Sequence, residues 1–80
     1  ERAIAKSSAN AKSNFENSNL NHVVWINATL TNTNFKNTDL RYSIFSNVDF
    51  SNVDLTGAII DDTTVFSDTE LNCVNHEICN

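Results

Sequence analysis

The sequence predicts an all-β solenoid, in which short coils of chain stack on one another. The first observation is a large apolar residue at every fifth position, and these residues are Phe15, Leu20, Trp25, Leu30, Phe35, Leu40, Phe45, Phe50, Leu55 and Ile60. A fixed period is typical of repeat architectures, in which each unit buries its apolar residue against the neighbouring units. A period of five matches neither the α-helix nor the flat β-strand. The chain must therefore turn within every unit.

The second observation concerns the two residues before each apolar centre. Two positions before the centre the residue is small, as at Ser13, Thr33 and Ala58, so each unit supplies one large and one small inward group. The residue directly before the centre is usually Asn or Asp, as at Asn14, Asn19, Asn34, Asp39, Asp49 and Asp54. These residue types favour turns because their side chains bond to nearby backbone and tolerate unusual dihedral angles.

The segments S-N-F-E-N at 13–17, T-D-L-R-Y at 38–42 and V-D-L-T-G at 53–57 closely resemble the pentapeptide-repeat family. The resemblance implies a right-handed quadrilateral parallel β-helix with four units per coil, in which residues twenty apart stack. The centres then form the columns Phe15/Phe35/Leu55, Leu20/Leu40/Ile60, Trp25/Phe45 and Leu30/Phe50. One residue inserted near Asp61 to Thr63 brings Phe66 and Leu71 into the pattern, which gives about three coils.

The chain divides into three expected parts. Residues 13–72 form the β-helix. Residues 1–12 are rich in alanine, which favours a short N-terminal helical cap, although a helix of this length is marginal without packing. Residues 73–80 leave the five-residue rhythm and are expected to cap the other end. The chain begins at Glu1 rather than Met, so we expect it to be processed or part of a longer protein.

Two cysteines, Cys73 and Cys79, both fall in the expected C-terminal cap. A disulfide is the preferred interpretation, because it would rigidify a cap for which the repeat offers no partner. Two free thiols are the main alternative. A metal site of Cys73, His76 and Cys79, with His22 as a distant fourth ligand, is weaker because structural zinc sites need four ligands. A disulfide would indicate the periplasm, the thylakoid lumen or secretion, and free thiols the cytoplasm.

The formal net charge is −5, with ten acidic and five basic residues. This balance disfavours direct nucleic-acid binding, since such affinity comes largely from Lys and Arg on phosphates. Stacking is expected to bring Glu16 beside Lys36 and Arg41 beside Asp61, as surface ion pairs that contribute ~0 to 1 kcal/mol. No apolar stretch approaches the ~18 residues of a membrane span, so none is predicted.

The chain offers little catalytic chemistry, and we predict that it is not an enzyme and needs no cofactor. His22, Tyr42 and Asp62 fall at equivalent positions of successive coils, and such groups transfer protons in some enzymes. A square prism presents flat faces rather than a cleft, and the insertion near Asp61 displaces the third member. Surface polar contacts are the preferred interpretation of this column.

The repeat breaks at outward positions that carry aliphatic residues, namely Val24, Ile26, Ile44 and Ile59. Val24 and Ile44 are expected to stack on the side that holds Trp25 and Phe45. Clustered exposed apolar residues mark interaction sites, whereas scattered ones are normal on any protein. If the residues are clustered, Val24, Ile26 and Ile44 form a contact surface for an unknown protein partner or for self-association. Uncapped coil edges are a second route to self-association.

Two classes of function remain open. The first is a non-enzymatic structural or protein-binding module that presents the flat faces of a rigid prism to an unidentified partner. The second follows from the resemblance, because some acidic members of the family imitate duplex DNA and bind DNA gyrase. Three coils at ~4.8 Å are much shorter than a ~34 Å turn of DNA, so the first class is preferred. The resemblance also extends to thylakoid-lumen and periplasmic proteins of obscure role.

Overall fold

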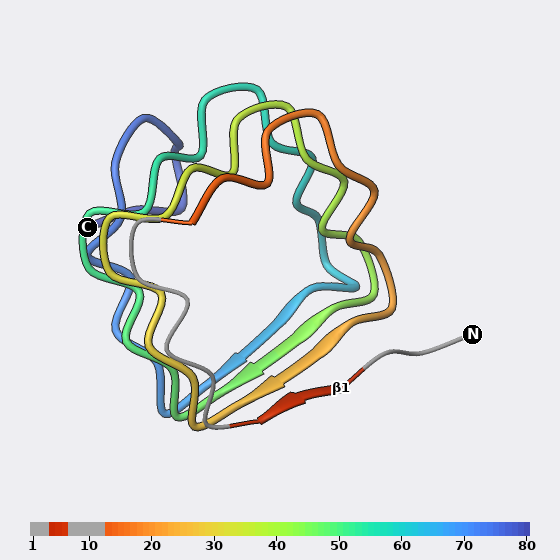
Figure 1. Cartoon of the computed structure of the whole chain (residues 1–80), viewed down its shortest axis with the longest axis vertical. Helices are drawn as coiled ribbons and strands as arrows, with labels where there is room; N and C mark the ends of the chain where they lie inside the picture. Colours follow the sequence, from red (N-terminus) through yellow and green to blue (C-terminus); the bar gives the residue numbers. More distant parts are fainter. Residues whose placement is uncertain (1–3, 7–12) are drawn as a thin grey trace.

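The computed structural model describes residues 4–6 and 13–80. The strands are β1 (Ile4–Lys6), β2 (Val24–Ile26), β3 (Ile44–Ser46) and β4 (Val65–Ser67), and they form one parallel sheet in the order β1-β2-β3-β4. Each strand is one side of a coil, and the chain travels around the molecule before it returns to the next strand (Figure 1). The fold is therefore a parallel β-helix, and the described residues contain no helix.

The other sides of each coil are held by single backbone bridges rather than by strands. Parallel bridges run up three further columns, which are Asn14–Asn34–Asp54–Val74, Asn19–Asp39–Ile59 and Thr29–Asp49. Together with the sheet these columns define four sides, in agreement with the four-sided outline of the coils in Figure 1. The predicted quadrilateral β-helix is confirmed.

The register of the sheet shows where the repeat gains and loses a residue. Val24 pairs with Ile44 after twenty residues, whereas Ile44 pairs with Val65 after twenty-one. The predicted insertion between Ile60 and Thr64 therefore exists. Spacing returns to twenty at the bridge between Asp54 and Val74, so the chain omits one residue at Cys73. The last coil is longer at one corner and shorter at another.

Ten units of the described chain turn at the second residue after their apolar centre. The Ser18 N–H donates to the Phe15 carbonyl at 3.0 Å, which closes a β-turn, and the Glu16 N–H donates to the Asn14 side chain at 2.9 Å. The turn residue adopts a positive φ of 51° to 71°. Residues in this conformation are Asn17, His22, Asn27, Asn32, Asn37, Tyr42, Asn47, Asn52, Gly57 and Asp68.

The apolar centres fill the interior of the prism. Those of the middle coils are buried, namely Trp25, Leu30, Phe35, Leu40, Phe45, Phe50 and Leu55. Those nearer the two ends are partly buried, namely Phe15, Leu20, Ile60, Phe66 and Leu71. Rings of one column stack across successive coils, with centroids 5.9 Å apart for Trp25 and Phe45 and 5.1 Å for Phe45 and Phe66. The stack replaces the compact centre of a globular domain.

The expectation of an N-terminal helical cap is wrong for Ile4–Lys6. These residues form β1, and Ala5 pairs with Trp25 in a register of twenty residues. The physical reason is that the edge of β2 offers backbone partners to an extended segment, whereas a twelve-residue helix has marginal stability alone. β1 thus adds a further level to the three predicted coils. The remainder of the expected cap, at 1–3 and 7–12, lies outside the described residues.

Candidate functional site

The outer face of the sheet carries a continuous aliphatic column. Val24, Ile44 and Val65 occupy register-matched positions of β2, β3 and β4 on the face opposite to Trp25, Phe45 and Phe66. Val24 and Ile44 are half-buried, and Val65 is 46 % exposed. We call these three residues the apolar strip. Successive levels of the strip are separated by the ~4.8 Å between hydrogen-bonded strands.

The sequence prediction placed Val24, Ile26 and Ile44 in one contact surface. The structure brings Val24 and Ile44 together but puts Ile26 in the neighbouring outward column, where Ser46 and Ser67 follow it. Ile26 is half-buried and continues the apolar surface only at the level of β2. Ile59, which is 49 % exposed, lies on another side of the prism in the column of Asn19 and Asp39.

Val65 is the member of the strip that sequence reasoning missed. The sequence does contain a pattern that identifies Val65. Ser43-Ile44-Phe45 has a small, an aliphatic and an aromatic residue in that order, and Thr64-Val65-Phe66 repeats this order. The inserted residue shifts this segment by one position, so a strict period of twenty assigns Val65 to the wrong place. The register of β3 against β4 restores it to the strip.

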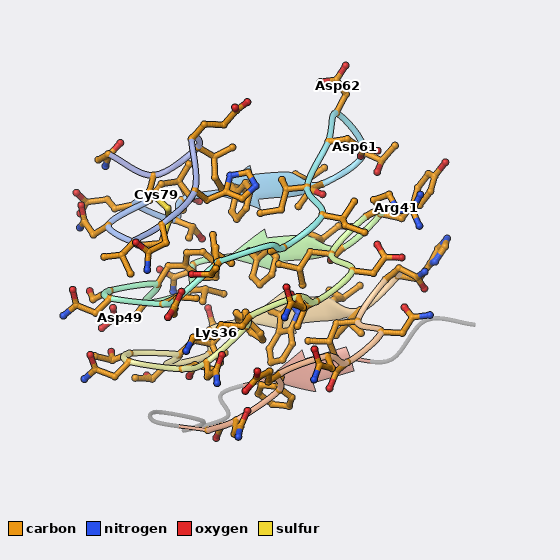
Figure 2. The ribbon with its side chains drawn as sticks, turned by 90° about the horizontal axis from the view of Figure 1, so that it is seen from above. Lys36, Arg41, Asp49, Asp61, Asp62 and Cys79 are labelled. Atoms are coloured by element: carbon orange, nitrogen blue, oxygen red, sulfur yellow. A yellow bond between two sulfur atoms is a disulfide. The ribbon has the colours of Figure 1, made fainter. Side chains whose placement is uncertain are left out.

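The predicted column of His22, Tyr42 and Asp62 is only partly formed. The rings of His22 and Tyr42 stack with centroids 4.8 Å apart and planes 11° apart. At the third level the Thr63 hydroxyl, rather than Asp62, meets this column and accepts the Tyr42 N–H at 2.9 Å. Asp62 projects from the end of the stack (Figure 2). The arrangement therefore lacks the carboxylate that a proton-transfer pair would need.

A polar groove of about 530 Å³ lies on the side of the prism that the chain forms directly after each strand of the sheet. It starts at Asn27, Asn47 and Asp68, which directly follow the last residues of β2, β3 and β4. Its other polar walls include Asp49, Ser51 and Glu70. The groove and the outer face of the sheet therefore meet at one corner of the prism. Figure 2 shows Asp49 on the opposite side of the molecule from Arg41 and Asp61.

Short-range hydrogen bonds fix the carboxylates on the outer surface. The Ser51 hydroxyl donates to Asp49 at 2.6 Å and lowers the pKa of that carboxyl, and the Ser51 N–H donates to the same oxygen. The Arg41 guanidinium binds Asp39 at 2.8 Å and holds the pKa of Asp39 well below its usual range. These carboxylates stay ionised near neutral pH.

The expected ion pairs differ from those observed. Lys36 lies 3.8 Å from Asp54, and Arg41 pairs with Asp39. Glu16, expected beside Lys36, instead accepts a hydrogen bond from the Asn34 amide at 3.3 Å. The turn brings residues two apart side by side on the outer surface. Arg41 therefore binds Asp39 of its own unit rather than Asp61 of the next coil. Neither Lys36 nor Arg41 lines the groove.

Cys73 and Cys79 form a disulfide with a Cα–Cα distance of 5.2 Å. Cys73 is buried, while Ile78 and Cys79 pack against the core from the C-terminal segment. The Asn80 N–H donates to the Leu71 carbonyl at 2.7 Å, which ties the end of the segment to the last coil. With its two sulfurs joined, the triad of Cys73, His76 and Cys79 does not form a metal site. The described part of the chain has no cluster of three His, Cys, Asp or Glu residues placed to hold a metal.

Comparison with known proteins supports the assignment made from the fold. The sequence profile of pentapeptide repeats occurs in eight copies and matches residues 11–47 and 34–72. The chain belongs to the pentapeptide-repeat family. Its β-helix is therefore right-handed, as the resemblance implied. No curated protein sequence matches this pentapeptide-repeat chain.

One solved structure similar to this pentapeptide-repeat chain is a pentapeptide repeat protein from the thylakoid lumen of Arabidopsis thaliana. The two chains are 22 % identical, the TM-score is 0.38, and the match covers 86 % of this chain. This chain spans 61 % of the length of that protein. Within the described residues, no helix is both long and apolar enough to cross a membrane.

Proposed function

We propose that this pentapeptide-repeat chain is a non-enzymatic protein-binding module and that the apolar strip is its contact surface. The observation that carries the proposal is the register of Val24, Ile44 and Val65 on the outer face of a parallel sheet. Parallel sheets usually have both faces covered. Here the aromatic core covers one face, and the outer face presents aliphatic side chains that a partner would cover.

The scaffold suits such a role. Turn residues with positive φ, side-chain caps on the turns and stacked core rings hold each outward position in place. A rigid surface loses little conformational entropy when it binds, so a small contact area gives more affinity than a mobile loop of equal size would. Adjacent levels of the strip are also close enough for one partner segment to contact all three residues.

Two alternatives find less support in the geometry. Proton transfer would need a carboxylate beside His22 and Tyr42, and Thr63 occupies that position. Imitation of duplex DNA needs a rod, whereas the longest dimension here is 25 Å, less than one ~34 Å turn of DNA. The outward Asn, Ser and Thr residues further dilute the charge that a DNA mimic requires.

We further propose that the protein works outside the reducing cytosol. This proposal rests on the Cys73–Cys79 disulfide, because such bonds form and persist in oxidising compartments. The periplasm, the thylakoid lumen and the secreted state all meet this condition. A cytoplasmic location becomes the better interpretation if native protein contains two free thiols.

The contact surface is tested with Val24→Lys combined with Ile44→Lys. Both lysines point outward, so the double variant should fold normally and lose capture of any partner that wild-type protein retains from an extract of its native compartment. Glu16→Lys is the matched control, since it makes the same change in net charge at an exposed site away from the sheet. Equal capture by wild-type protein and the double variant would exclude the strip as the contact surface.

A further inference from the structure

The apolar strip and the polar groove are parts of one continuous surface. Each strand has only three residues, so the strip at the start of the strands lies about 10 Å from the corner at Asn47 and Asp68 where the groove begins. Three or four residues of an extended chain span that distance. A single segment of a partner can therefore contact both parts.

The charge of the groove is negative and unbalanced. Asp49, Asp68 and Glu70 line it, and no lysine, arginine or histidine does. The side chains of Asp68 and Glu70 have no hydrogen-bond or ion-pair partner within residues 4–6 and 13–80. Lys36 and Arg41 are paired with Asp54 and Asp39 and do not line the groove.

The same imbalance extends over the whole second half of the chain. From Tyr42 to the C-terminus there is no lysine or arginine, while the carboxylates in this stretch are Asp49, Asp54, Asp61, Asp62, Asp68, Glu70 and Glu77. The outward position that holds the neutral Thr29 in one coil holds the carboxylate of Asp49 in the next coil toward the C-terminus. Negative charge therefore rises toward the C-terminal end of the groove.

We propose that the strip and the groove together bind a segment of a partner protein in which apolar residues and lysine or arginine are separated by three or four positions. This inference rests on the proposed function of the strip and adds the chemistry of the partner. Apolar side chains of the segment cover Ile44 and Val65, and its cationic side chains reach Asp68 and Glu70. Electrostatic complementarity of this kind gives specificity and faster association more than raw affinity.

Other occupants fit less well. A second copy carries the same −5 charge, and from Tyr42 onward it has no lysine or arginine with which to meet Asp68 and Glu70. A single metal ion is also a poor fit, because the carboxylates in the described chain do not converge as a group of metal ligands. An extended cationic segment can meet separated carboxylates one by one.

The experiment measures binding of a fluorescein-labelled peptide of twelve residues, with alternating Leu and Ser in one half and alternating Lys and Ser in the other. Fluorescence anisotropy is recorded with the intact 80-residue chain at low and high salt. Two control peptides replace every Lys by Glu or every Leu by Ser. Protein variants are Asp68→Asn with Glu70→Gln for the groove, Ile44→Thr with Val65→Thr for the strip, and Glu77→Gln as a carboxylate outside the groove.

The proposal predicts saturable binding of the Leu/Lys peptide alone. Neutralising Asp68 and Glu70 should weaken it about fivefold at low salt, as expected for two exposed ion pairs, and should reduce its salt dependence. Glu77→Gln should bind like wild-type protein. Binding that the strip variant loses and the groove variant keeps would overturn the basic partner but leave the strip as the contact surface. Binding unaffected by the strip variant would overturn both proposals. Equal binding of the Glu peptide would overturn the basic partner alone and leave the strip as the contact surface.

Discussion

Ile44 pairs with Val65 twenty-one residues later, although Val24 pairs with Ile44 after twenty. Thr63 adapts the backbone to the extra residue. In the coil below, the His22 N–H donates to the Arg41 carbonyl at 3.2 Å, whereas the equivalent Tyr42 N–H donates to the Thr63 hydroxyl at 2.9 Å. A side-chain oxygen has replaced a backbone oxygen, so β4 keeps its place in the sheet despite the longer corner.

Thr63→Val tests this replacement. Valine keeps the shape of threonine but removes both hydrogen bonds of the hydroxyl, which accepts the Tyr42 N–H and donates to Asp61, so the free energy of unfolding should fall by about 1 kcal/mol. Urea unfolding followed by circular dichroism gives this number. Thr63→Ser retains the hydroxyl and should lie much nearer the parent. Equal destabilisation by the two variants would show that the hydrogen bonds of the hydroxyl contribute nothing.

The β-helix was predictable because a single large residue per unit, such as Phe35 or Leu40, enters the interior wherever the chain turns. Stacking then fixes which residues are neighbours. The insertion was also visible, since Phe66 falls one position late in an otherwise regular series. The sequence pattern thus encodes the coils through burial, which depends only on apolar residues recurring at a constant spacing.

Contacts that depend on side-chain reach were harder to predict. Arg41 binds Asp39 rather than Asp61, because the turn brings residues two apart together before stacking does. β1 was expected to be helical, because the composition of 1–12 carries no signal for the free edge that β2 presents. The groove was missed altogether, since its walls come from three coils and it contains no motif that is continuous in sequence.

Phe35→Asp tests the assignment of the interior columns. Phe35 is 0 % exposed, and a carboxylate there has no cation beside it, so the variant should fail to show a cooperative thermal transition. Phe35→Leu keeps an apolar centre of the kind found at other levels and should still melt cooperatively. A Phe35→Asp protein that melts like the parent would mean that this side chain is not inside the prism.

Gly57 is the glycine among the turn residues with positive φ, and a side chain at this position would meet Asn37. Its φ is +71°, and a Cβ atom would lie 2.1 Å from the Asn37 side-chain oxygen of the coil below. Gly57→Ala should therefore lower the free energy of unfolding by about 1 to 2 kcal/mol. Adding Asn37→Gly removes the clash and should recover part of the loss in urea unfolding. If the double variant is no more stable than Gly57→Ala, the whole loss of stability comes from the backbone conformation at residue 57.

Acid should destabilise the protein through Asp39. Arg41 lowers the pKa of Asp39 in the folded state, so folding is favoured above the unfolded pKa of about 3.9 and this contribution is lost as the pH falls through the lower folded value. Hydroxyl donors lower the pKa of Asp49 and Asp54 as well, and these act in the same direction.

Arg41→Gln should accordingly flatten the decline of the melting temperature below about pH 4, relative to the parent. Lys36→Gln is the matched control, because Lys36 lies 3.8 Å from its carboxylate and contributes less to the pKa of Asp54 than the Thr56 hydroxyl does. Melting curves recorded across the acid range provide the comparison. Identical acid limbs for Arg41→Gln and the parent would exclude the Arg41–Asp39 pair as a source of the pH dependence.

Reduction should loosen the C-terminal cap without unfolding the coils. The Cys73–Cys79 disulfide closes a short loop with a sequence separation of 6, for which chain entropy alone gives about 2 kcal/mol. Reductant should add two hydrogens to the intact mass and lower the melting temperature, and Cys79→Ser should melt like reduced protein. Thiol labelling of denatured, unreduced protein should find no reactive cysteine. Two labelled thiols would show that native protein contains no disulfide, and the argument for an oxidising compartment would then fail.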